Sequence, residues 1–398
     1  MDLKNILYNF YVHSPSSYST TMADVADVKP CSNPGCDQPG TKSCSACKTT
    51  FYCCVICQTA DWIKHKEECD GHLRKVGTTN LAKAEGFYGE RNYVQTLRFA
   101  NLAATKLRQL KDRRLETVQL INDALECKYY ALNFMGRHRE AKECAEERYT
   151  LWAMNQMRNP GSIKAAFGLI ESCILNKNYE DAEHYARHAM FMINDMADNF
   201  IPSDQRSRFL AEGSYYLAQA IYGLAEAGGI PPEEKQKAGE EAIALARKAL
   251  EIHTRLHGAE SNDVAHDMGA LASVLDFFND VDNDEAIRLY EQAMAIRARL
   301  EGSSSMNVAS NNYNLGTAYF RRANRADSAN DPVGVLANLE LALPHYREAA
   351  RIFGSINLVD KANEATQSVT RTEENIRQVR IHIAARTAAA AAAAATRG

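Results

Sequence analysis

Seven cysteines and one histidine between Cys31 and Cys69 constrain this chain more than any other feature. They form four pairs with metal-ligand spacing: Cys31-x4-Cys36, Cys44-x2-Cys47, Cys53-x3-Cys57 and His65-x3-Cys69. The stretch is too short and too polar to bury an apolar core. A structural zinc ion held by four thiolate or imidazole ligands contributes its binding energy to folding. Four ligand pairs fill two tetrahedra and leave no open position for a catalytic water, so the pattern predicts two structural zinc ions.

Spacing alone leaves the pairing of these ligands open. The four pairs can bind the two ions in sequence, or they can interleave. Cys54 offers a second choice, because Cys54-x2-Cys57 also has zinc-ligand spacing, and His72 competes with His65.

Several landmarks join the ligands: the step Phe51-Tyr52-Cys53, the pair Cys57-Gln58, and Trp62. With them, residues 31–69 resemble a MYND zinc finger. The resemblance implies an interleaved cross-brace and favours Cys53 over Cys54. It assigns Cys31, Cys36, Cys53 and Cys57 to the first zinc. It assigns Cys44, Cys47, His65 and Cys69 to the second zinc. The first pair is longer than the commoner C-x2-C, and Asn33-Pro34-Gly35 is expected to turn the extra length.

MYND fingers are protein-interaction modules, and several recognise short peptides that contain proline and leucine. The resemblance places the peptide-binding surface at Gln58 and Trp62. An exposed indole offers a flat platform for a proline ring, and an amide bonds an extended peptide backbone. The alternative is that Trp62 only forms the small core of the finger.

A helical repeat follows the finger from 81 to 386. Leucine-centred segments recur around Leu169, Leu217, Leu271 and Leu315. Each is followed by a segment with small or aromatic residues at i, i+4 and i+7, which is one face of a helix. These residues are Ala182/Ala186/Ala189, Ala242/Ala246/Ala249, Ala286/Tyr290/Ala293 and Ala342/Tyr346/Ala349. A weaker first copy has Ala141 and Ala145 after a turn at Gly136.

The phrase ALEIHTRLHGAESNDVA recurs as AMAIRARLEGSSSMNVA, 44 residues later from Gly258 to Gly302. This spacing resembles tetratricopeptide repeats of the kinesin-light-chain style, in which each unit is a helix–turn–helix. The resemblance implies an extended groove for peptides or helices. Asn311, Asn312, Tyr313 and Asn314 are candidate groove contacts, and the alternative for half of them is that they are solvated or packed. The alternative is a generic helical bundle.

The predicted fold class is therefore all-α: a TPR-like helical-repeat solenoid preceded by a small two-zinc MYND finger. Polar insertions at 225–239 and 322–334 are expected at turns within units, as spacers. Residues 358–386 fit a capping helix. The chain is expected to divide into a disordered segment 1–30, the finger 31–69, a connector 70–80, the solenoid 81–386 and an Ala-rich disordered tail 387–398. Met22 begins a sequence typical of a protein start, so we hypothesise that 1–21 are an upstream extension.

Composition excludes several classes of function. The net charge of −4 and the balanced charges of the finger argue against nucleic acid as a partner. No apolar run approaches the roughly 20 residues of a membrane span. Cysteines with metal-ligand spacing are typical of intracellular proteins, in the cytoplasm or the nucleus.

The sequence predicts a zinc-binding adaptor that is not an enzyme, with protein or peptide partners for both the finger and the groove. One rival is a MYND-associated lysine methyltransferase. Such an enzyme needs a SET domain, for which the roughly 30 residues before the finger and the helices after it leave no room. A second rival is a self-assembling scaffold. Glycine-rich phosphate loops, H-E-x-x-H and G-x-S-x-G are missing from the sequence.

Overall fold

The computed structural model describes residues 29–110, 114–154, 159–195, 202–279, 283–328 and 330–395. The chain divides into two compact units, and the boundary falls between Gly77 and Thr78. The expectations for residues 1–28, including the upstream extension, lie outside the described residues.

The first unit holds a two-stranded antiparallel sheet and the beginning of a helix. Strand β1 (Lys42–Ser43) pairs with β2 (Phe51–Tyr52), with Lys42 opposite Tyr52. An isolated bridge joins Pro30 to Pro39. Gly40 is required beside this bridge, because a Cβ there would lie 2.8 Å from the Cβ of Phe51. Helix α1 (Val55–Gly89) follows, and its 35 residues include the 70–80 segment that we expected to be a connector.

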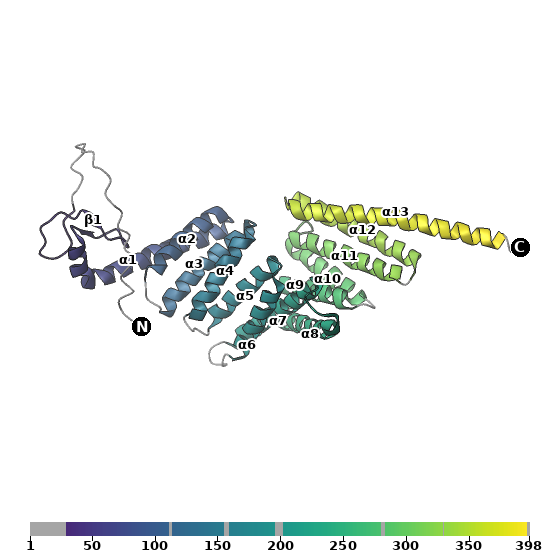
Figure 1. Cartoon of the computed structure of the whole chain (residues 1–398), viewed down its shortest axis with the longest axis horizontal. Helices are drawn as coiled ribbons and strands as arrows, with labels where there is room; N and C mark the ends of the chain where they lie inside the picture. Colours follow the sequence, from purple (N-terminus) through teal and green to yellow (C-terminus); the bar gives the residue numbers. More distant parts are fainter. Residues whose placement is uncertain are drawn as a thin grey trace, which may run out of the picture. The chain divides into compact units, whose positions relative to one another are not determined.

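The second unit is an array of paired helices, shown in chain order in Figure 1. After α1, the pairs are completed by α2 (Tyr93–Arg108), α3 (Leu115–Phe134), α4 (His138–Met154), α5 (Pro160–Leu175) and α6 (Tyr179–Asp195). The array continues with α7 (Ser203–Glu226), α8 (Pro232–His257), α9 (Asn262–Phe278) and α10 (Asp284–Glu301). The last helices are α11 (Met306–Ser328), α12 (Pro332–Ser355) and α13 (Val359–Ala395). From α2 to α13, each helix packs against its neighbours in sequence, so the predicted helical-repeat fold is confirmed.

The small-residue faces are the reason why the pairs pack closely. Every alanine and tyrosine predicted on them, from Ala141 to Ala349, is buried. An alanine face lets the backbone of the second helix approach the first, and the larger leucines of the first helix fill the space between. Helix α2 carries the same face with Ala100, Ala103 and Ala104, a further copy that the sequence pattern missed.

The odd-numbered helices also contact one another. Helix α5 packs on α7, α7 on α9 and α9 on α11, in addition to their partners within each pair. The even-numbered helices instead meet through long side chains, for example Arg187 of α6 with Glu241 of α8 and Arg247 of α8 with Glu285 of α10. The odd-numbered helices are therefore the more closely spaced layer. We call it the inner layer.

The two predicted insertions fall at the expected turns, but they lengthen helices rather than loops. Helices α7 and α8 have 24 and 26 residues, whereas α5 and α6 have 16 and 17. Proline at the first position of α8 and of α12 restarts each helix soon after the turn. Likewise, α13 continues as helix to Ala395, where we expected a disordered tail. Alanine has the highest helix propensity, and no breaker interrupts the run.

Gly258 and Gly302, which mark the 44-residue recurrence, end α8 and α10 with φ angles of 79° and 92°. Each donates its backbone N–H to a carbonyl one turn earlier, Thr254 and Ala298 respectively. A side chain at either position would be strained in this left-handed region, so glycine fixes both turns.

Candidate metal centre and peptide-binding surface

The structure brings the eight predicted ligands together in two groups. One contains Cys31, Cys36, Cys53 and Cys57, and the other contains Cys44, Cys47, His65 and Cys69. Within each group, the candidate ligand atoms all lie within 4.8 Å of one another. This interleaved arrangement joins the loop at 31–36 to the start of α1 and the β1–β2 hairpin to the middle of α1.

Local structure explains how the ligands converge. The Asn33-Pro34-Gly35 segment turns as expected, since Gly35 has a φ of 82° and Cys36 donates its backbone N–H to the Asn33 carbonyl. His65 and Cys69 are one turn apart on α1 and share a face. One long helix carries Cys57, His65 and Cys69, and Cys53 lies just before it.

In the second group, the imidazole is oriented for metal binding. His65 Nδ1 lies 3.1 Å from Thr50 Oγ1, and His65 Nε2 lies 3.4 Å from Cys47 Sγ. A proton on Nδ1 donated to Thr50 leaves the Nε2 lone pair directed at the group centre. Thr50 therefore orients a zinc ligand, a role that no spacing in the sequence indicated.

The pKa values of the crowded thiols in this group favour a bound cation. Burial and then the charges of Cys44 and Cys47 raise the pKa of Cys69 to about 12. Burial also opposes ionisation of Cys47, but hydrogen bonds from Thr49 and Thr50 outweigh it and lower the Cys47 pKa to about 6. Three crowded thiols cannot all ionise beside one another unless a divalent ion compensates their charge.

The donor sets, three thiolates with one imidazole and four thiolates, are those of structural zinc, and all four positions of each tetrahedron come from the protein. The residues fit two structural zinc ions, as predicted from the sequence. Cys54 lies outside both groups, with its Sγ 3.6 Å from that of Cys53. Neither group includes His72.

Trp62 and Gln58 lie on α1 among the zinc ligands. The Trp62 ring meets the His65 ring edge to face, with 6.0 Å between centroids, and 41% of the side chain stays exposed. Val55, Ile56 and Ile63 are exposed around it, with Ile63 at 86%. Residues seven apart lie on the same side of a helix, so Val55 aligns with Trp62 and Ile56 with Ile63. We call Val55, Ile56, Trp62 and Ile63 the apolar face of α1.

The small core of the finger is built by other residues. Tyr52 is buried and donates its hydroxyl to Asp61 Oδ2 at 2.8 Å, and Leu73 is buried further along α1. Burial, followed by the hydrogen bond to Asp61, holds the pKa of Tyr52 well above its usual value. The sequence carried a signal for the exposed apolar face that we did not use: the apolar residues of 55–63 recur with a spacing of seven.

The expected groove contacts in α11 are corrected in part. Asn311 and Asn312 are buried, and their side-chain oxygens face Arg297 of α10 and His345 of α12. They join neighbouring helices and do not face a ligand. Tyr313 packs against Tyr346 and donates to Glu364, and both Tyr313 and Asn314 are half-buried.

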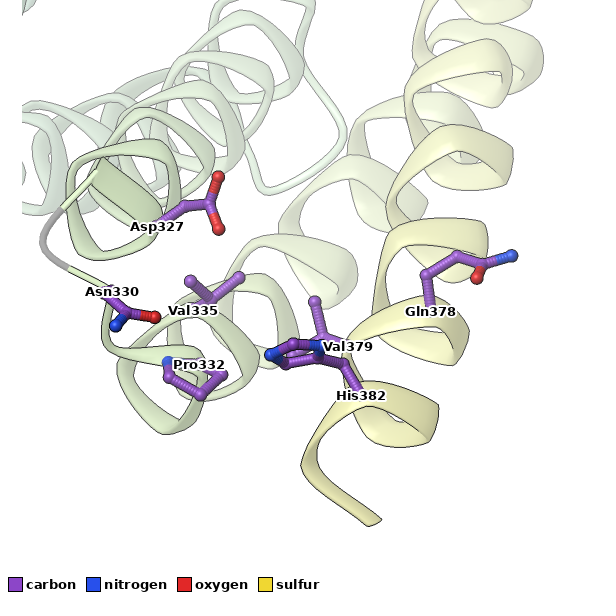
Figure 2. Close-up of a pocket in the computed structure, with 7 residues that line it drawn as sticks. All are labelled: Asp327, Asn330, Pro332, Val335, Gln378, Val379 and His382. Carbon is purple, nitrogen blue, oxygen red and sulfur yellow. The ribbon is translucent and has the colours of Figure 1, made fainter. Parts of the chain in front are cut away.

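A hollow lies near the end of the helical array. Figure 2 shows its lining side chains from the α11–α12 turn and from α13. Its volume is about 230 Å³, and it is lined by Asp327, Asn330, Pro332, Val335, Gln378, Val379 and His382. None of the site residues predicted from the sequence lies there.

Within the described ranges, no helix combines the length and the apolar character that a bilayer crossing requires.

The geometry thus defines a structural two-metal cysteine and histidine centre. Comparison with known proteins gives it a family: residues 31–69 match the family model of the MYND finger. Tudor domain-containing protein 1 of Danio rerio is 40% identical over 63 residues, which is 16% of this chain and 5% of that protein. The match therefore covers only a small part of that relative.

The solved structures similar to this chain are helical-repeat proteins. BtubC (BKLC) from P. vanneervenii is 18% identical, with a TM-score of 0.44, over 67% of this chain and 92% of that one. A Podosopora anserina putative kinesin light chain with nearly identical TPR-like repeats is 15% identical, with a TM-score of 0.43. The match covers 58% of this chain and 98% of that one. At these scores, the assignment of repeats rests on the helix pairing described above.

Proposed function

We propose that this chain is a non-enzymatic adaptor whose MYND finger binds a short peptide of a partner protein on the apolar face of α1, with Gln58 and Trp62 as the principal contacts. The inner layer of the helical array contacts a second partner. All eleven cysteines are free of disulfides, which suits a reducing compartment, the cytoplasm or the nucleus.

The exposed indole is the observation that supports this proposal most directly. A tryptophan that served only as a core residue would be covered, yet Trp62 is exposed on one side and held by a zinc ligand on the other. The metal therefore fixes the ring without covering it. Rigid aromatic side chains lose little conformational entropy when a partner binds, so they are common among the residues that dominate binding energy.

The chemistry around Trp62 favours a peptide with proline and leucine. A proline ring stacks on the indole, and leucine side chains contact Ile56 and Ile63, which the described residues leave exposed. Gln58 lies one turn before Trp62 and is half-buried, so its amide is positioned to bond the backbone of an extended peptide. The basic and acidic residues of the finger nearly balance, which favours protein over nucleic acid as the partner.

Fluorescence anisotropy of the zinc-loaded full chain tests the proposal. The probes are labelled peptides containing proline and leucine at varied spacing. Trp62→Ala is expected to weaken the best of them by about tenfold or more, and Gln58→Ala by less. Glu68→Ala is the matched control, because Glu68 is exposed and lies about 120° around α1 from Trp62.

Native mass spectrometry must show two zinc ions in each variant, so that lost binding is not lost folding. Equal binding by Trp62→Ala and the parent chain would refute the assignment of this surface, as would a parent chain that binds none of the peptides.

A further inference from the structure

An exposed aromatic cluster lies at the beginning of the helical array. Tyr88 of α1, Tyr93 of α2, and Tyr130 and Phe134 of α3 pack ring against ring. The Tyr93 and Phe134 rings stack 4.7 Å apart, and the Tyr88 centroid lies 6.0 Å from Tyr130 and 6.2 Å from Phe134. Phe134 nevertheless remains 60% exposed and Tyr130 37%. Exposed apolar clusters of this kind are typical of interaction surfaces.

Carboxylates accompany these rings along the inner layer. Glu126 lies one turn before Tyr130 on α3, and Glu171 of α5 accepts a 2.7 Å hydrogen bond from the Tyr129 hydroxyl. Burial, then the charges of Glu126 and Glu171, raise the pKa of Tyr130 to about 12. Glu126 also contributes to the raised pKa of Tyr88, after burial, Tyr93 and Cys127.

Aromatic rings and carboxylates also accompany one another on α5 and α7. The Phe167 ring of α5 lies 5.4 Å from that of Tyr216, and Glu212 lies one turn before Tyr216. Burial and then Glu171 raise the pKa of Tyr216, with further contributions from Tyr215 and Glu212. We call Tyr88, Tyr130 and Tyr216 with Glu126, Glu171 and Glu212 the tyrosine–carboxylate face.

The negative charge of this face is only partly compensated. Arg148 pairs with Glu126 at 2.8 Å, but its own side chain is buried. Among the residues that the structure describes, no cation lies within ion-pair distance of Glu171 or Glu212. Lys164, Arg208 and His253 act on Glu212 only at longer range. Half-buried carboxylates without a counter-ion favour a cationic ligand.

We propose that the tyrosine–carboxylate face docks an arginine-containing segment of a partner protein, with guanidinium groups stacked on Tyr130 and Tyr216 and paired with Glu171 and Glu212. Arginine suits both groups, because its planar cation stacks on aromatic rings and pairs with carboxylates. The proposal rests on the adaptor function, and it names the chemistry of the second partner. The exposed Phe134 ring accommodates the apolar residues that flank the arginines.

The test is binding of a short labelled peptide of alternating glycine and arginine to the full, zinc-loaded chain. The parent chain is expected to bind it more tightly than the matching glycine–glutamate peptide, and added salt is expected to weaken the binding. The double variant Glu171→Gln/Glu212→Gln is expected to weaken it about tenfold or more. Tyr130→Ala is expected to weaken it as well, without a change in charge.

The matched control is Glu143→Gln/Glu251→Gln, which removes two exposed charges from the even-numbered helices α4 and α8. Unchanged circular dichroism and melting temperature in every variant exclude unfolding. The proposal is overturned if the parent chain binds the two peptides equally or not at all. It is also overturned if the control variant loses as much affinity as Glu171→Gln/Glu212→Gln, or if sedimentation shows that a second copy occupies the face instead.

The same preparations separate this proposal from the function proposed for the finger. A variant that loses binding of the arginine peptide but still binds the proline- and leucine-containing peptide is altered only at the tyrosine–carboxylate face. Trp62→Ala is expected to have the opposite effect.

Discussion

The finger and the helical array achieve stability in contrasting ways. In the finger, most buried side chains are zinc ligands, with Tyr52 and Leu73 as the main additions. In the array, successive helix pairs contribute separate apolar clusters, such as that around Leu271 and Tyr290 and that around Leu339 and Tyr346. Stability is concentrated in two metal ions in the first unit and distributed over many contacts in the second.

The difference also decides where each unit can expose apolar surface. Because metal ions hold α1 in the finger, its apolar face is not needed for a core and can stay open. In the array, most of the leucines and alanines are buried between helices, and the surface left on the inner layer includes the tyrosines and carboxylates described above. The two units thus offer surfaces of unlike chemistry.

Removal of zinc is the change that should separate the two units most. A structural zinc site contributes about 10 kcal/mol or more to folding, so chelation with EDTA should unfold the finger while the helices of the array persist. Cys44→Ser should lose the zinc of the second group, whereas Cys54→Ser should retain two ions. Native mass spectrometry and far-UV circular dichroism measure both effects. Collapse of the helical signal on chelation would contradict the independence of the array.

Within the array, a buried carboxylate should have the next largest effect. Asp276 of α9 is 1% exposed and accepts hydrogen bonds from Asn283 at 2.7 Å and from Arg321 of α11 at 2.8 Å. Asp276→Ala removes the buried carboxylate that these two partners share and leaves Arg321 paired with the half-exposed Glu226, so we expect a loss of about 3 kcal/mol in the free energy of unfolding by urea.

Glu226→Ala is the control for Asp276→Ala. Glu226 is half-exposed and contacts the same Arg321 at 3.1 Å. An exposed pair of this kind contributes less than about 1 kcal/mol. Equal losses for the two variants would show that burial does not set the difference.

The smallest expected effect is a pH dependence at the 44-residue recurrence. His253 of α8 lies 2.6 Å from the buried Asp267 carboxylate of α9. Burial lowers the pKa of His253, but the hydrogen bond and charge of Asp267, with Asp263 and Glu212, outweigh it and leave the pKa raised. A histidine whose folded pKa is raised stabilises the protein fully below its unfolded pKa, and this stabilisation is lost as pH rises through the folded pKa.

Urea midpoints measured from pH 5 to pH 9 check this expectation. The parent chain should lose stability with rising pH relative to His253→Gln, and the comparison cancels the contributions of His266 and His345, whose pKa values burial lowers. Parallel curves for the two proteins would contradict it. The equivalent positions one recurrence later hold Arg297 and Asn311, which do not titrate in this range.

Much of the fold could be predicted because its signals are local. Ligand pairs spaced for one ion identified both zinc sites, and the alanine faces identified the helix pairs. The errors arose where contacts with other helices decide the position of a residue. Asn311 and Asn312 looked like groove contacts because their helix faces could not be oriented without Arg297 and His345. The two insertions looked like loops, although their residues continue the helices on either side.

The sequence by itself determined the metal chemistry and the helical repeat, because ligand type, ligand spacing and helix periodicity act over a few residues. The tertiary structure alone decided which side chains remain accessible. Trp62 stays open because zinc holds α1 in place of an apolar core, and Tyr130 stays open because its neighbours Tyr129 and Leu132 take the buried positions on α3. Exposure depends on residues distant in the chain, and for that reason a local pattern can indicate an apolar face but does not show whether the face is covered.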